Sequence, residues 1–293
     1  MFARVNGCRI FFDVEGLQYI PDGPVMREKP VCLVLHGGPG ADHTHFMPDL
    51  SPLSEVCQLI YIDDRNTGRS ERTDVHTSSI RQNVEDIEAL REYLGLDKVF
   101  ILGQSYGGMK AQYYVSHYPE HLYGAMILST GSNAAAIANS RVAEHVREYG
   151  TEEQYRTWTS GDVFTGKMSF DEYLEIMLPL YHGKGKIKLD EAITASKRGL
   201  KNDDVVQYQF GNELACFDLR PDLKNVKVPC VIVCGEKDFI CDVDANREIA
   251  ETIPGAEFHV IPEASHEVIA DYPEIVFPIL KDFIDRHFQK QQA

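Results

Sequence analysis

The sequence predicts an α/β fold in which a mostly parallel sheet carries helices on both faces. Short continuous apolar runs such as VCLVL and KVFIL are typical of strands buried on both sides of such a sheet. These runs alternate with segments whose apolar residues repeat at helical spacing, and this alternation favours a parallel sheet. A chain of 293 residues is long enough to bury a core of this kind.

In the first half of the chain, each element follows from a local pattern. The opening RVNGCRIFFDVEG places an Asn-Gly turn between two apolar runs, which predicts a β-hairpin. VCLVLHGG and QLIYIDD are expected to be buried strands. Residues 79–94 carry their apolar side chains on one helical face, and Gly95 is a suitable helix stop. KVFILGQS is the next expected strand, and a helix over 107–117 follows it.

The second half resumes the same alternation after a helical interruption. YGAMILST and PCVIVCGEKD are expected strands, 243–253 a helix, AEFHVIPEASH a strand and loop, and 272–288 the closing helix. The stretch between the first two lacks strand-like runs. We therefore predict a core domain of residues 1–130 and 221–293, into which a helical cap of residues 131–220 is inserted.

The charge and the cysteines limit the classes of function. A net charge of −16 repels nucleic acid and anionic membrane surfaces, so neither is an expected partner. The expected partner is a small-molecule or short-peptide substrate, for the reasons given below. No run approaches the length of a membrane span, no secretory signal is seen, and a cytoplasmic location is expected. Seven cysteines, several within apolar runs, favour free thiols, and neither metal nor cofactor is expected. The oligomeric state stays open.

The stretch GQSYG predicts a nucleophile. Gly103 and Gly107 flank Ser105 in the G-x-S-x-G pattern, between a predicted strand and a predicted helix. In this context a sharp turn holds the serine hydroxyl above the sheet, and the glycines allow the backbones to approach closely. Ser105 is therefore the candidate catalytic nucleophile.

A serine hydroxyl needs a base, and the base needs an acid that orients it. In this fold the expected chain order is Ser, then Asp or Glu, then His. Asp238 follows a predicted strand, and His266 lies in a loop before the last helix, 28 residues later. Asp238 and His266 are our candidates for the remaining catalytic residues.

Other residues near these two are weaker candidates. Asp242 and Asp244 lie at the start of the next helix, where a carboxylate is more often a cap, with Asp242 at the N-cap position. Glu236 is too close to the strand to reach across the site. His259 lies inside a predicted strand and is expected to be structural.

Hydrolysis through an acyl-enzyme also needs two N–H donors for the oxyanion. The amide of Tyr106, directly after the nucleophile, is one candidate. Gly38, in the HGGPG loop, is the other. His36 at the start of that loop is expected to be a structural hydrogen-bonding residue.

HGGPG, DDRNTGRS, GQSYGG, GEKD and SH occur in this order, and the chain resembles α/β-hydrolase serine peptidases of the proline iminopeptidase family. The resemblance spans nearly the whole chain. It implies that Ser105, Asp238 and His266 form the catalytic triad and that Gly38 and Tyr106 supply the oxyanion donors. It also implies that the helical insertion is a cap that shapes the substrate pocket.

One departure from the family pattern bears on the substrate. Iminopeptidases bind the substrate's free α-ammonium with glutamates, but Phe239 follows Asp238 here, and Glu213 is the one cap glutamate that is a candidate. Glu213, Phe239 and the only tryptophan, Trp158, are therefore named as candidate substrate contacts. If the carboxylates are absent, an uncharged ester or amide is the better substrate.

The DDRNTGRS block is expected to be structural. Asn66 stands where the family usually has glycine, and asparagine tolerates the left-handed conformation that such a turn needs. Arg65 and Arg69 are expected to pin the loop through ion pairs with neighbouring acids such as Asp63.

The sequence thus leads to three hypotheses. The first is a serine hydrolase of the iminopeptidase type, which releases an N-terminal residue from small peptides or amides. The second is an esterase, lactonase or amidase with the same machinery and a neutral substrate. The third, a receptor without turnover, is disfavoured because all three triad residue types are present in the expected order.

Overall fold

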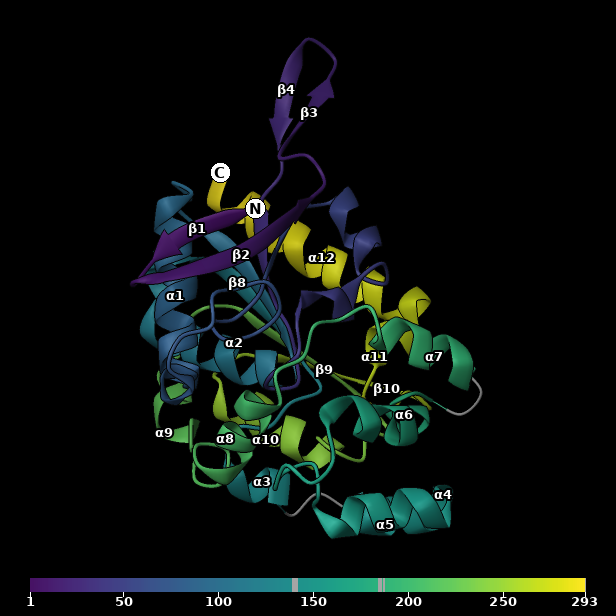
Figure 1. The fold of residues 1–293 in the computed structure, drawn as a ribbon. Helices are drawn as coiled ribbons and strands as arrows, with labels where there is room; N and C mark the ends of the chain where they lie inside the picture. The colour runs from purple at the N-terminus through teal and green to yellow at the C-terminus, as the bar shows by residue number, and fades with distance from the viewer. Residues whose placement is uncertain (139–141, 184–185, 187, 293) are drawn as a thin grey trace.

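The computed structural model describes residues 1–138, 142–183, 186 and 188–292, and it confirms the α/β architecture (Figure 1). Eight strands form one sheet in the order β1-β2-β6-β5-β7-β8-β9-β10, with β1 and β2 antiparallel to their neighbours and the other pairs parallel. The strands are β1 (Phe2–Val5), β2 (Cys8–Glu15), β5 (Val31–Leu35), β6 (Gln58–Ile62), β7 (Val99–Gln104), β8 (Leu122–Leu128), β9 (Cys230–Gly235) and β10 (Glu257–Ile261).

Two hydrophobic clusters, one on each face of the sheet, form the core. Along β5, Leu33 and Leu35 belong to one cluster and Cys32 and Val34 to the other, as the alternation of side chains along a strand requires. The first cluster includes residues of α1 (Ile80–Tyr93), α2 (Tyr106–His117) and α10 (Val243–Thr252), and the second includes residues of α11 (Val268–Asp271) and α12 (Pro273–Gln292). The predicted helices are thus present on both faces of the sheet.

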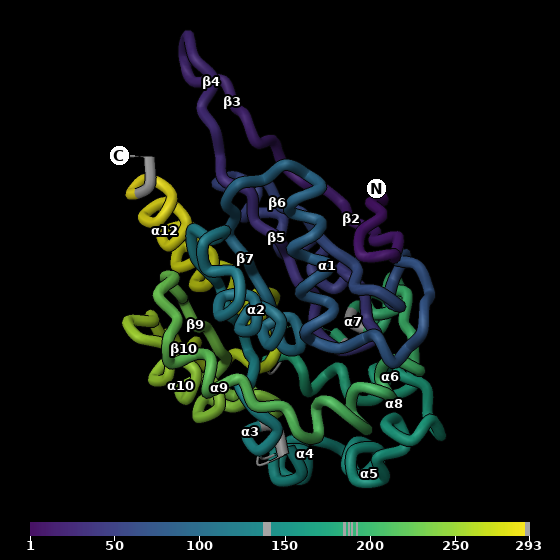
Figure 2. Tube along the Cα trace, turned by 90° about the vertical axis from the view of Figure 1, so that its left-hand side faces the viewer, coloured from purple at the N-terminus to yellow at the C-terminus, as the bar shows by residue number. Residues whose placement is uncertain are grey.

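The chain begins with the predicted hairpin and continues with one that was not predicted. Asn6 and Gly7 join β1 to β2 with φ of 47° and 73°, as a type I′ turn needs. A second hairpin, β3 (Tyr19–Asp22) and β4 (Val25–Glu28), projects from the body as a separate two-stranded sheet (Figures 1 and 2). Its signal in the sequence is Asp22-Gly23, in a stretch too polar for a buried strand.

The described helices between β8 and β9 cover one end of the sheet. They are α3 (Ala134–Ala138), α4 (Val142–Tyr149), α5 (Glu152–Ser160), α6 (Phe170–Tyr181), α7 (Leu189–Ser196) and α8 (Asp203–Gly211), with the short α9 (Arg220–Leu223) after them. Of these, α4, α5, α6 and α8 share a hydrophobic cluster that includes Val146, Tyr173 and Met177. We refer to this insertion as the cap. Among the described residues, no helix is long and apolar enough to cross a bilayer.

Short 3₁₀ segments complete the connections: η1 (His43–Phe46), η2 (Ser51–Glu55), η3 (Val75–Thr77) and η4 (Pro119–His121). The cap is tied to the core through two of the loops nearby. Asn202 Nδ2 donates to the Asn66 carbonyl over 2.8 Å, and Leu200 N–H donates to Asp42 Oδ2 over 2.8 Å. The start of α8 is therefore fixed to the loop after β6 and to the loop after β5.

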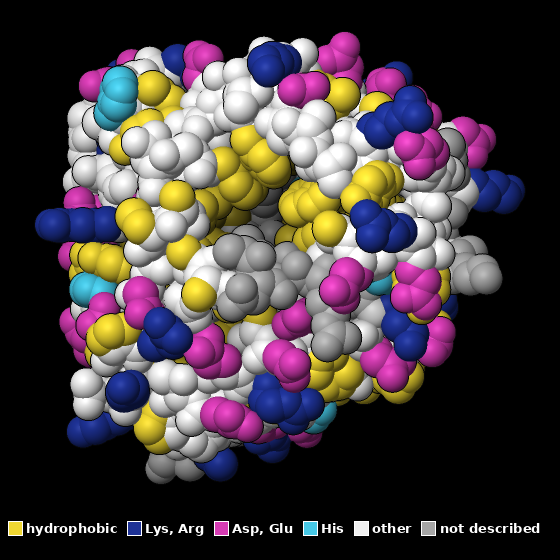
Figure 3. All heavy atoms as spheres, turned by 90° about the horizontal axis from the view of Figure 1, so that it is seen from below, with side chains coloured by type: hydrophobic (Ala, Val, Ile, Leu, Met, Phe, Trp, Pro, Cys, Tyr) yellow, Lys and Arg dark blue, Asp and Glu magenta, His cyan; other side chains and the backbone are white. Residues whose placement is uncertain are grey.

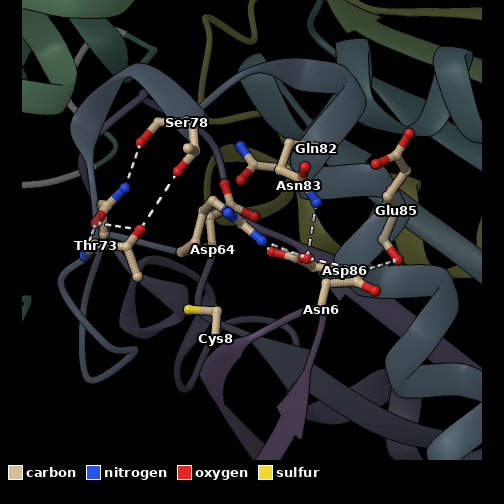
Figure 4. Close-up of polar contacts among 12 residues, drawn as sticks. Asn6, Cys8, Asp64, Thr73, Ser78, Gln82, Asn83, Glu85 and Asp86 are labelled. Carbon is tan, nitrogen blue, oxygen red and sulfur yellow. Dashed lines mark hydrogen bonds and ion pairs between the residues drawn. The ribbon is translucent and has the colours of Figure 1, made fainter.

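The DDRNTGRS loop is pinned as predicted, but through other partners. Arg65 makes a buried bidentate pair with Asp86 on α1 (Nε–Oδ2 2.7 Å, second contact 2.8 Å), and Asp86 also accepts from Asn6 (Figure 4). Arg69 lies 3.7 Å from Asp42. The expected partner Asp63 instead accepts the Arg69 backbone N–H and contacts a histidine, because its carboxylate is completely buried under the loop.

Candidate active site

Ser105 stands at the sharp turn between β7 and α2. Its φ of 55° and ψ of −122° lie in a region that L-residues rarely adopt, the strained geometry expected of a nucleophile elbow. The surrounding backbone fixes this turn: Ser105 N–H donates to the Leu128 carbonyl over 3.0 Å, and Thr130 Oγ1 donates to the Ser105 carbonyl over 2.7 Å.

The glycines beside Ser105 leave no room for a side chain. A Cβ atom on Gly103 would overlap the Gly107 carbonyl, and one on Gly107 would overlap the Leu35 carbonyl on β5. The pattern G-x-S-x-G is thus required by contacts between backbones of the strand, the helix and the neighbouring strand. The elbow predicted from the sequence is confirmed as a backbone conformation.

Asp238 and His266 meet as predicted. The Nδ1 atom of His266 lies 2.9 Å from Asp238 Oδ2, and both side chains are buried. The other oxygen, Asp238 Oδ1, accepts the backbone N–H groups of Ile240 (3.0 Å) and Cys241 (2.9 Å). Since the carboxylate accepts the Nδ1 proton, the Nε2 atom is left without one and can act as a base.

Asp242, the alternative carboxylate near Asp238, is a helix cap as expected. Asp242 caps α10 by accepting the Ala245 N–H over 2.9 Å. His259 lies within β10, as expected. Neither residue lines the cavity that contains Ser105.

The His266–Asp238 pair predicts the pH dependence of activity. Burial alone would lower the pKa of His266, but the Asp238 carboxylate more than offsets this, and the net pKa is raised above 6.5. The base works only when unprotonated, so kcat/KM should rise with pH through a midpoint above 6.5. The measurement is a pH–rate profile on a neutral ester, with circular dichroism at each pH to detect unfolding. A midpoint below 6.5 would contradict the assignment.

The HGGPG loop lies beside the elbow, with His36 beneath it. His36 is completely buried, and burial lowers its pKa, so the ring is neutral. Its Nδ1 atom lies 3.0 Å from the Gly37 carbonyl and Nε2 lies 3.3 Å from the Asp64 N–H, so the proton is on Nδ1. His36 is thus the structural hydrogen-bonding residue that the sequence predicted.

This hydrogen bond orients the next amide. The Gly37–Gly38 peptide is trans, so the Gly38 N–H points away from His36. Gly38 has φ of 52° and lines the cavity, and its N–H donates to no residue that the structure describes. Tyr106 is the first residue of α2, where an amide has no partner within the helix. Neither candidate oxyanion donor gives its N–H to an acceptor within the described part of the chain, and of the two only Gly38 lines the cavity.

A cavity of about 330 Å³ opens between the core and the cap, within the range of small-molecule sites. Ser105, His266 and Gly38 line it on the core side. The cap side is mostly apolar and includes Val142, Trp158, Phe164, Phe170, Tyr173 and Phe210. The space-filling view from below shows a hollow with hydrophobic walls on this side of the molecule (Figure 3).

The three candidate substrate contacts fall in different places. Trp158 lines the cavity. Phe239 is buried and stacks on His145 at 4.8 Å between ring centroids, outside the cavity wall. Glu213 accepts the Ile80 N–H over 2.8 Å at the start of α1 and does not line the cavity. The structure therefore does not bring Glu213 or Phe239 to the substrate space.

Sequence reasoning missed other polar residues on the cavity wall. Glu267 directly follows His266, and Asp49 and His45 lie in the segment after the HGGPG loop. The sequence did offer a signal for Glu267, since it directly follows the candidate base in the stretch Ser265-His266-Glu267. Asp49 and His45 had no comparable signal, because only the fold brings their segment to the site.

Comparison with known proteins places this architecture in a family. Residues 30–273 match the family model of the alpha/beta hydrolase fold. The chain is 25% identical over 294 residues to proline iminopeptidase PfmaB of Pestalotiopsis fici, covering 97% of this chain and 99% of that protein. It is also 25% identical to a proline iminopeptidase of Saccharolobus solfataricus, with 97% and 92% covered.

The fold has close counterparts among solved structures. A proline iminopeptidase-related protein from Thermus thermophilus superposes with a TM-score of 0.76 at 22% identity, covering 97% of this chain and 96% of that one. VinJ superposes with a TM-score of 0.77 at 19% identity over 98% of both chains. The chain therefore belongs to the alpha/beta hydrolase fold family, and within that family it is proline iminopeptidase-like.

Proposed function

We propose that this hydrolase works through a serine acyl-enzyme and releases the N-terminal residue of small peptides or amides. The observation that carries the proposal is that Ser105, on a strained elbow, and His266, held by Asp238, line one cavity with the free amide of Gly38. The resemblance to proline iminopeptidases supports the choice of an aminoacyl substrate.

The proposed mechanism assigns one role to each group. His266 Nε2 takes the proton of the Ser105 hydroxyl as its oxygen attacks the substrate carbonyl, and Asp238 stabilises the imidazolium that forms. The amides of Gly38 and Tyr106 stabilise the oxyanion. His266 then protonates the leaving amine. In the second half, His266 takes a proton from water as the water oxygen attacks the acyl carbonyl, and it returns that proton to Ser105 Oγ, which leaves as the acid is released.

An esterase, lactonase or amidase with a neutral substrate is the second candidate, because one feature of the cavity favours it. The described part of the cap contributes no aspartate or glutamate to the wall. A neutral, apolar acyl group would suit that wall better than an ammonium group would.

Three substrates assayed in parallel distinguish the candidates: proline arylamide, N-blocked proline arylamide and a short-chain aryl ester. The proposed function predicts turnover of the unblocked arylamide, with kcat/KM at least about tenfold above that of the blocked one. Strong ester turnover with neither arylamide cleaved would instead support the second candidate. No turnover of any of the three would contradict both.

A further inference from the structure

Negative charge is distributed unevenly around the catalytic cavity. Among the described residues, the carboxylates on its wall are Asp42, Asp49 and Glu267, and all three come from the core. Asp42 is already engaged, since its two oxygens accept the N–H groups of Thr44 (3.1 Å) and Leu200 (2.8 Å). Two carboxylates therefore remain for a ligand.

Glu267 is placed to receive a positive group. Its side chain is only 13% exposed, and its Oε2 atom lies 3.2 Å from Gln104 Nε2 and 3.3 Å from His45 Nε2. Its second oxygen, Oε1, accepts from no residue that the structure describes. One oxygen thus orients the carboxylate, and the other is left for the cavity.

Glu267 is linked to the candidate catalytic residues through the backbone and through one shared hydrogen-bond donor. Glu267 is the residue after His266, and the Gln104 side chain that holds it also donates to the His266 carbonyl over 3.0 Å. Gln104 itself precedes Ser105. A ligand group on Glu267 would therefore lie in the same part of the cavity as the reacting bond.

The ionisation of the two acids agrees with this placement. Burial would raise the pKa of Glu267, but the neighbouring histidines, His45 first, and the hydrogen bond from Gln104 together more than offset it, and the net pKa is lowered. Asp49 is exposed as a residue, but it lines the cavity, and desolvation there followed by the charge of Glu267 raises the pKa of its carboxyl. Asp49 accepts from none of the described residues, so a cation between the two acids would relieve their repulsion.

The cationic side chains nearby leave one oxygen of Glu267 open. His45 contacts only the Oε2 atom, at 3.3 Å. Lys201 pairs with Asp171 at 2.6 Å, and His182 pairs with Asp271 at 3.1 Å. Arg198, whose side chain is exposed, is the one arginine on the wall among the described residues. Asp49 is more exposed to solvent than Glu267, so water screens its charge and it is the weaker of the two ligands.

We propose that Glu267, assisted by Asp49, is a specificity-determining residue that binds a protonated amine of the substrate. The preferred substrate then carries a primary or secondary ammonium group, held on the core side, and a bulky apolar group that packs against the cap. This inference deepens the proposed function and rests on the same cavity being the reaction site. In this arrangement the core provides the carboxylates that the described part of the cap does not.

Binding to the Ser105→Ala variant tests the inference without turnover. Calorimetry compares 2-phenylethylammonium with its neutral counterpart 2-phenylethanol. The ammonium should bind at least about tenfold more tightly, and Glu267→Gln should remove most of that difference, because a neutral amide no longer pairs with the ammonium charge. Glu263→Gln is the matched control: Glu263 is exposed on the same loop and does not line the cavity. Equal affinities for the two probes would overturn the inference.

Turnover provides the second measurement. The ratio of kcat/KM for the unblocked over the N-blocked proline arylamide should fall at least about tenfold in Glu267→Gln and stay as in the parent in Glu263→Gln. Asp49→Asn should reduce the ratio by a smaller factor. Because Asp49 is exposed, this variant should fold, and it tests the inference even if Glu267→Gln does not fold. A ratio unaffected in both variants would overturn the inference. Ammonium selectivity in binding without turnover of any substrate would overturn only the proposed function.

Discussion

Ser105→Ala should lower kcat by roughly four to six orders of magnitude, because no other group can form the acyl-enzyme. The change removes one hydroxyl from a partly exposed side chain and keeps the backbone contacts that fix the elbow, namely those to Leu128 and Thr130. Thermal unfolding should therefore stay close to that of the parent. The measurement is kcat on an aryl ester, together with covalent labelling by a fluorophosphonate.

Ser116→Ala is the matched control for this variant. Ser116 lies on the same helix, α2, and its hydroxyl donates to the Gln112 carbonyl over 3.0 Å, away from the cavity. It should retain both labelling and turnover. Labelling of the Ser105→Ala variant at the rate of the parent would show that another residue is the nucleophile.

Asp238→Asn should lower kcat by roughly four orders of magnitude while leaving the fold intact. The single carbonyl oxygen of asparagine would be kept by the backbone N–H groups of Ile240 and Cys241, which Asp238 Oδ1 now accepts. The amide NH₂ would then face His266 Nδ1 and donate to it. The imidazole proton would move to Nε2, and the ring could no longer accept the proton of Ser105.

Asp242→Asn separates this effect from a general loss of negative charge near the loop. Asparagine caps a helix about as well as aspartate does, so the cap of α10 on Ala245 should survive. Its kcat should remain within about twofold of the parent, since Asp242 does not line the cavity. If the two variants lost activity equally, Asp238 would not be the residue that orients His266.

Much of the core could be predicted because its signals are local. The strands β5, β7 and β9 are continuous apolar runs buried on both faces, and each was expected from composition alone. The elbow at Ser105 was also predictable, since glycine is the one residue that fits where a Cβ would strike a carbonyl. Asn66 has a φ of 65°, so the expectation that asparagine would accept the left-handed turn is confirmed.

The side-chain pairings around the site, and with them the cavity wall, could not be predicted, because they depend on contacts between segments far apart in the sequence. Arg65 pairs with Asp86 rather than with Asp63 two residues before it, since the middle of α1 lies beside the loop in three dimensions. In the same way, Glu213 holds the Ile80 amide although its cap position favoured a substrate contact. Which cap side chains face the cavity is decided by how the cap helices rest on the sheet.

The glycine contacts at the elbow have a consequence for how such a protein can diversify. The orientation of the nucleophile is set by Gly103, Gly107 and the backbone of β5, all inside the core and independent of the cap helices. Substitutions on the cap side of the cavity can therefore alter which substrates fit while the Ser105 hydroxyl keeps its orientation. Substitutions in the inserted helices can therefore change the substrate preference without changing the position of the nucleophile.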